Sequence, residues 1–64
     1  MQDKFLDIYN KVFDENGGIK PCGRNITISL IDMAKKLDPG KDFGNTHTGI
    51  MNVDNIKKLY ETIK

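Results

Sequence analysis

The chain of 64 residues has one cysteine, Cys22, and one histidine, His47. A single cysteine cannot form an intramolecular disulfide, and without a CxxC pair or a second histidine a structural zinc site lacks ligands. We therefore expect no metal and no other cofactor. A chain this short buries only about 60% of its unfolded surface, so we expect a partner chain to complete the core, most simply in a homodimer.

Long hydrophobic runs and a strong charge imbalance are also missing. No stretch approaches the roughly 18 apolar residues of a membrane span, and the acidic, amphipathic sequence after Met1 is not typical of a signal peptide. We therefore expect a cytoplasmic protein with no membrane partner. The ten basic and nine acidic residues nearly cancel, which argues against a nonspecific nucleic-acid coat and leaves a local basic patch open. The Lys-, Ile-, Asn- and Asp-rich composition suits an AT-rich genome, as in bacteria and their phages.

Three stripes of apolar residues at helical spacing predict an all-α fold. The stripes consist of Phe5, Leu6, Ile8, Tyr9, Val12 and Phe13; of Ile26, Leu30, Met33, Ala34 and Leu37; and of Val53, Ile56, Leu59, Tyr60 and Ile63. We expect one compact three-helix domain over residues 1–64, with helices at 3–14, 26–37 and 53–63. A long structured loop at 41–51, between the second and third helices, completes this interpretation.

The start of the second helix is ambiguous in the sequence. Asn25 or Thr27 could cap it, since both side chains can accept a hydrogen bond from the first turn. The apolar residues Ile26, Ile28 and Leu30 also alternate with polar ones, so a short extended segment before the helix stays open.

Helix-breaking and capping residues mark the other helix boundaries. Asn-Gly-Gly at 16–18 should stop the first helix, and Asp-Pro-Gly at 38–40 should stop the second. Asn52 is the natural N-cap of the third helix, and Met51 and Ile56 are spaced as a hydrophobic staple around it. In the long loop we expect Phe43 and Ile50 to anchor the backbone to the core.

Two polar loops that contain glycine are the candidate contact sites, because each leads into a helix start with free backbone N–H groups. In the first, Lys20 and Arg24 flank Gly23, and the Arg24 guanidinium could bind a carboxylate or phosphate in a bidentate manner. The competing interpretation is a turn with two solvated basic residues. The segment is not a P-loop, because no Gly-Lys-Ser/Thr follows at the required spacing.

The second loop reads Asn45-Thr46-His47-Thr48. Its hydroxyls and imidazole could make polar contacts with a partner. The competing interpretation is that these side chains stabilise local turns and the entry to the helix.

Catalysis by Cys22 is the weakest of the interpretations. Lys20 and Arg24 would lower the pKa of its thiol, but a nucleophile also needs a base, and a Cys22–His47 dyad requires the two loops to meet. A packing role for Cys22 is favoured, and no enzyme is predicted.

These observations favour a small noncatalytic interaction or regulatory protein that contacts a protein partner through both loops. The expected contact residues are Lys20, Arg24, Asn45, Thr46, His47 and Thr48. The alternative is a small nucleic-acid-binding domain that uses Lys20, Arg24 and the polar residues of the last helix, namely Asn55, Lys57, Lys58 and Thr62. A helix-turn-helix is not expected, because the connection at 38–51 is much longer than the turn of that motif.

Overall fold

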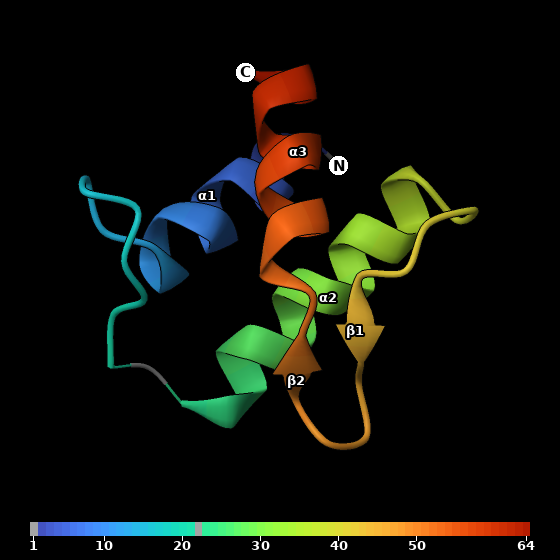
Figure 1. Ribbon diagram of the computed structural model, residues 1–64, viewed down its shortest axis with the longest axis horizontal. Helices are drawn as coiled ribbons and strands as arrows, with labels where there is room; N and C mark the ends of the chain where they lie inside the picture. Colours follow the sequence, from blue (N-terminus) through green and yellow to red (C-terminus); the bar gives the residue numbers. More distant parts are fainter. Residues whose placement is uncertain (1, 22) are drawn as a thin grey trace.

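The computed structural model describes residues 2–21 and 23–64, and three helices and a short β-hairpin form its framework (Figure 1). The elements are α1 (Gln2–Val12), α2 (Arg24–Leu37), β1 (Gly44–Asn45), β2 (Ile50–Met51) and α3 (Val53–Ile63). The strands pair antiparallel, with Gly44 opposite Met51 and Asn45 opposite Ile50. The roles expected for Cys22 lie outside the described residues.

The expected all-α fold is therefore correct for the helices and wrong for the long loop. The fold is mostly helical, with a small two-stranded sheet where an irregular loop was predicted. Strands of two residues are too short to leave an alternating apolar pattern in the sequence, so periodicity could not reveal them.

The first helix ends earlier than expected, at Val12 rather than at residue 14. Phe13 instead forms an isolated antiparallel bridge with Ile19, and the Lys20 N–H donates to the Val12 carbonyl at 2.7 Å. The Asp14 carboxylate closes the turn between them, because its Oδ1 accepts hydrogen bonds from the N–H groups of Asn16 and Gly18 at 3.0 and 2.8 Å. The stop predicted at 16–18 is thus the tip of a tight turn.

The second helix begins earlier than expected, at Arg24, so the residues up to Ile28 that could have formed a short extended segment are already helical. Neither Asn25 nor Thr27 is the N-cap; that position is held by Gly23, whose carbonyl accepts the Ile26 N–H at 3.1 Å. Helical spacing prevails over alternation here because it buries a continuous stripe, formed by Leu30, Ile31 and Ala34.

The expected bounds of the third helix, 53–63, are confirmed. Asn52 is its N-cap, as predicted, and its side chain accepts the Asn55 N–H at 3.2 Å. Ile56 is fully buried below this cap, and the half-buried Met51 packs against the same core.

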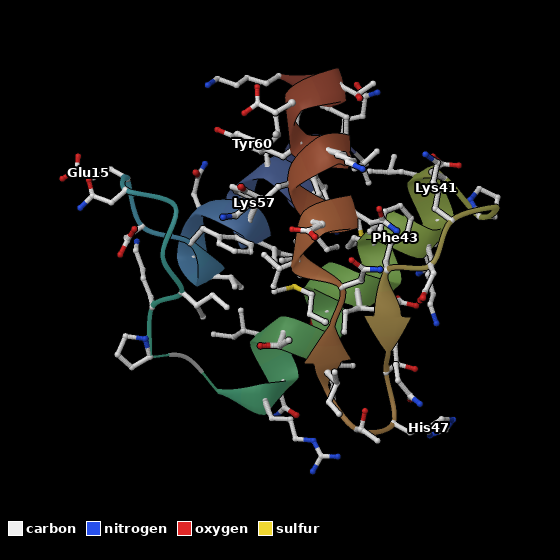
Figure 2. The ribbon with its side chains drawn as sticks, viewed as in Figure 1. Glu15, Lys41, Phe43, His47, Lys57 and Tyr60 are labelled. Atoms are coloured by element: carbon white, nitrogen blue, oxygen red, sulfur yellow. The ribbon has the colours of Figure 1, made fainter. Side chains whose placement is uncertain are left out.

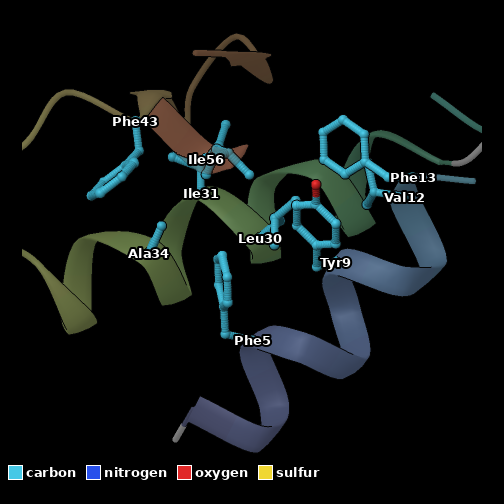
Figure 3. Close-up of a cluster of buried hydrophobic side chains, with 9 residues drawn as sticks. All are labelled: Phe5, Tyr9, Val12, Phe13, Leu30, Ile31, Ala34, Phe43 and Ile56. Carbon is cyan, nitrogen blue, oxygen red and sulfur yellow. The ribbon is translucent and has the colours of Figure 1, made fainter. Parts of the chain in front are cut away.

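The core lies where all three helices and the hairpin base converge (Figure 3). Its buried residues are Phe5, Tyr9, Val12, Phe13, Leu30, Ile31, Ala34, Phe43 and Ile56. Phe43 anchors the loop as expected, with only 1% of its surface exposed, whereas the anchor expected at Ile50 is wrong because that side chain is 70% exposed.

The total accessible surface of 4241 Å² matches the roughly 4200 Å² of a compact monomer of this mass. The shape alone therefore does not require a second copy.

Candidate contact site at the β-hairpin

The hairpin is fastened at its base to the core and to α3. The Asn52 N–H donates to the Phe43 carbonyl at 2.9 Å, which continues the strand pairing toward the helix. Asn55 on α3 donates through Nδ2 to the Asp42 carbonyl at 2.7 Å, and Asp42 Oδ1 accepts the Gly44 N–H at 3.1 Å. With Phe43 buried between these bonds, the hairpin projects from a fixed root.

Gly44 is required by the close approach of the two strands. Its φ of +121° lies in a region that L side chains rarely adopt, and an added Cβ would lie 2.3 Å from the Ile50 carbonyl oxygen and 2.8 Å from Met51 Cα. The strand pair can come this close only because no side chain separates the backbones.

Bonds within the segment 45–50 shape the tip of the hairpin. Asn45 Oδ1 accepts the His47 N–H at 2.8 Å, and the Asn45 carbonyl accepts the Gly49 N–H at 2.9 Å. Thr48 Oγ1 accepts the Ile50 N–H at 3.3 Å and also lies 3.5 Å from the Asn45 carbonyl oxygen. Asn45 and Thr48, two of the expected contact residues, therefore stabilise the turn themselves, in the way that Asx and ST turns do.

Arg24 joins this tip from the start of α2. Its guanidinium Nη2 donates to the carbonyl oxygen of His47. The aliphatic stem of Arg24 lies against Gly49, where an added Cβ would be 3.1 Å from Arg24 Cγ. The structure thus places Arg24 together with Asn45, Thr46, His47 and Thr48, as a hydrogen-bond donor to the loop.

Lys20, the remaining expected contact residue, lies elsewhere. Its Nζ donates to the Asn10 carbonyl of α1 at 3.0 Å. It borders a different hollow, between α1, the turn after it and the end of α3, which is also lined by Asp14, Glu15, Tyr60 and Glu61. The two basic residues of the first loop therefore do not form one anion site.

The hairpin presents a mixed apolar and polar surface. His47 lies at its far end (Figure 2), and the imidazole has no hydrogen-bond partner among the described residues. Ile50 is the most exposed large apolar side chain in the described part of the chain. An open hollow on this side is lined by Lys35 from α2 together with Asp42, Gly44, Asn45, Thr46, His47, Thr48, Ile50, Met51 and Asn52.

Ile50 was not among the contact residues predicted from the sequence. The only available signal was an isoleucine beside a glycine in a segment without helical periodicity. That pattern fits a core anchor equally well, and only the strand register shows that Ile50 pairs with the exposed Asn45 rather than facing the core.

The polar residues of α3 that supported the nucleic-acid alternative are partly engaged within the molecule. Lys57 Nζ donates to the Gly17 carbonyl at 3.0 Å and lies 5.6 Å from the centre of the Phe13 ring, so it ties α3 to the turn after α1 (Figure 2). Asn55 holds the hairpin base, as described above, and Thr62 Oγ1 donates to the Lys58 carbonyl at 2.9 Å.

A stack of aromatic rings lies under the second hollow. The Tyr9 and Tyr60 rings are 3.9 Å apart at an angle of 7°, and Phe13 stacks on Tyr9 at 4.5 Å. Burial raises the pKa of the Tyr9 phenol above its ordinary value, and the nearby Tyr60 and Glu61 raise this pKa further because their negative charges would repel a phenolate.

Within residues 2–21 and 23–64, no three His, Cys, Asp or Glu side chains gather as the ligands of a metal ion would. The helices of this part of the chain are too short and too polar to cross a membrane. Comparison with protein-family models, with curated proteins and with solved structures finds no match to this chain.

Proposed function

We propose that this chain is a small noncatalytic interaction or regulatory protein of the cytoplasm of a bacterium or its phage. Its contact site is the tip of the hairpin, residues 45–50. The observation that carries the proposal is an exposed isoleucine, Ile50, which lines one hollow with His47 and Thr46 on a loop whose root is bonded to the core.

A protein partner suits this surface better than a nucleic acid. Protein interfaces combine an apolar centre with a polar rim, and a loop that is already ordered loses little conformational entropy on binding. A nucleic-acid site would need clustered cations, but Lys20 and Arg24 lie in different places and Lys57 is bonded to Gly17. The nucleic-acid alternative therefore has less support.

Binding rather than catalysis also suits the chemistry of the hairpin. Its imidazole, His47, and its carboxylate, Asp42, are both exposed, whereas catalytic groups are usually held by burial and by charged neighbours. Self-association through other surfaces remains part of the proposal, since an additional interface would supplement the small core.

Two isoleucines provide a matched test of the contact site. Ile19 is 58% exposed and Ile50 is 70% exposed, so Ile19→Ser and Ile50→Ser remove similar apolar surface from different regions. The wild-type chain and both variants would be used as bait in extracts of the native host, with and without nuclease. We expect the same protein to bind the wild type and Ile19→Ser, to be lost with Ile50→Ser, and to resist nuclease.

The opposite outcomes are equally informative. A partner retained by Ile50→Ser would exclude the hairpin tip as the contact site. A partner lost on nuclease treatment, with binding that weakens steeply as salt rises, would favour the nucleic-acid alternative.

A further inference from the structure

The first turn of α2 is poorly suited to starting a helix. Its N-cap is Gly23, which makes no side-chain capping bond, its first turn holds no acidic residue, and its first residue is the cation Arg24. Positive charge at a helix N-terminus opposes the helix dipole, and the backbone N–H groups there gain most from a side-chain acceptor. Helix stability therefore does not explain an arginine at this position.

The contacts of Arg24 with the hairpin do explain it. The Arg24 guanidinium donates to the His47 carbonyl, 23 positions away in the chain. Its aliphatic stem packs against the side of Gly49 where another residue would carry a Cβ. Gly49 has a φ of +75°, so it is the residue at which the chain turns back into β2. The Arg24 side chain thus contacts the loop at two points, the His47 carbonyl near its far end and Gly49, where the chain enters β2.

The other hydrogen bonds of the hairpin tip join residues that are close in the chain, and they are exposed to solvent. Asn45 bonds the N–H groups of His47 and Gly49, and Thr48 bonds that of Ile50, all within the segment 45–50. Such local bonds open readily in an exposed loop, because few buried apolar contacts support them. A long-range contact adds a restraint that local turn chemistry does not provide.

We infer that Arg24 is a positioning residue that latches the hairpin tip to α2 and so presents His47 and Ile50 in one fixed arrangement. The latch acts through the backbone of His47 and Gly49, so Arg24 need not touch the partner. Its biological purpose rests on the proposed function, but the latch itself is a property of the free protein.

Amide hydrogen exchange, measured by NMR on the free protein, tests the latch directly. Arg24→Ala removes both contacts, and the matched control Lys41→Ala removes another exposed cation near the hairpin. We expect the His47 and Gly49 amides to exchange about tenfold faster in Arg24→Ala. The amides of Asn52 and Ile56, which belong to the hairpin base and α3, should keep their rates, and Lys41→Ala should leave all four unchanged.

A second variant keeps the test decisive if Arg24→Ala is poorly folded. Arg24→Lys retains the charge but loses the planar guanidinium, so the His47 and Gly49 amides should show a smaller acceleration in a fully folded protein. Unchanged exchange at both amides in both variants would overturn the latch. Equal acceleration at Asn52 and Ile56 would also overturn it, because the effect would then be on the whole fold.

The latch and the contact site can fail separately. If exchange rises at the tip as expected while Ile50→Ser still binds the partner, the latch stands and the proposed contact site is wrong. If exchange is unchanged while Ile50→Ser loses the partner, the contact site stands without the latch.

Discussion

Two small turns in this molecule are built alike but lie in different surroundings. The turn after α1 pairs Phe13 with Ile19, and the hairpin pairs Asn45 with Ile50. Each is shaped by an Asx side chain that accepts a backbone N–H two residues further on, and each carries an exposed isoleucine.

Each turn is also bonded to a cation from a distant helix. Lys57 of α3 donates to the Gly17 carbonyl, and Arg24 of α2 donates to the His47 carbonyl. The cations differ in their surroundings, since Lys57 is half-buried beside the Phe13 ring and Arg24 is exposed at a helix start. The first turn is therefore part of the packing of α1 on α3, whereas the hairpin tip projects beyond the core, with His47 and Ile50 exposed.

The largest expected effect on stability comes from inserting a side chain between the two hairpin strands at Gly44. Gly44→Ala would place a Cβ 2.3 Å from the Ile50 carbonyl oxygen at a φ of +121°, so we expect a loss of about 2–3 kcal/mol in the free energy of unfolding. Urea denaturation followed by circular dichroism measures it. Gly40→Ala is the control, because its Cβ would meet nothing within 4 Å; equal stability of the two variants would contradict the strand geometry.

The Lys57 tie should give the next largest effect. Lys57→Ala removes the bond to Gly17 and the contact with the Phe13 ring, which should cost about 1–2 kcal/mol of stability. Lys58→Ala, at an exposed neighbouring position, should change stability by less than about 0.5 kcal/mol. If the two lysine variants were equally stable, Lys57 would be no more than a solvated surface charge.

A pH effect should follow from the buried phenol of Tyr9. Its pKa is raised in the folded chain by burial and by Tyr60 and Glu61, so the folded state favours the protonated form. This contribution to stability is complete below the unfolded pKa of about 10 and is lost as the pH rises through the folded pKa. Thermal melts between about pH 8 and 11 should show a decline that is shallower in Tyr9→Phe; identical profiles would remove Tyr9 as its cause.

The smallest expected effects on stability are those of the two exposed isoleucines. Ile19→Ser and Ile50→Ser should each change the free energy of unfolding by less than about 0.5 kcal/mol, since both side chains are mostly solvated. A large loss in Ile50→Ser would mean that the hairpin tip is a structural element, like the turn after α1.

Much of the fold was predictable from local patterns, because the helices depend on nearby residues. Apolar spacing located all three helices, and Asn52 was identifiable as an N-cap from its side chain and position. The early start of α2 could not be predicted, because its N-cap, Gly23, has no side chain that would mark it in the sequence. The hairpin depends on the close approach of two backbones at Gly44, which no periodic pattern records.

The candidate site was predictable only in part, for a similar reason. The polar composition of 45–48 drew attention to the hairpin, but the partners of Arg24 and Lys20 depend on contacts between distant segments. Those contacts separate two basic residues that are near neighbours in sequence.

The most direct test of the central claim is site-specific photocrosslinking in native host cells. A photoreactive amino acid would replace Ile50 in one variant and Ile19 in the other, so that both probes start from exposed positions. We expect a discrete adduct with another protein from position 50, resistant to nuclease, and none of that mass from position 19. No adduct from position 50, or the same adduct from both positions, would contradict the assignment of the hairpin tip as the contact site.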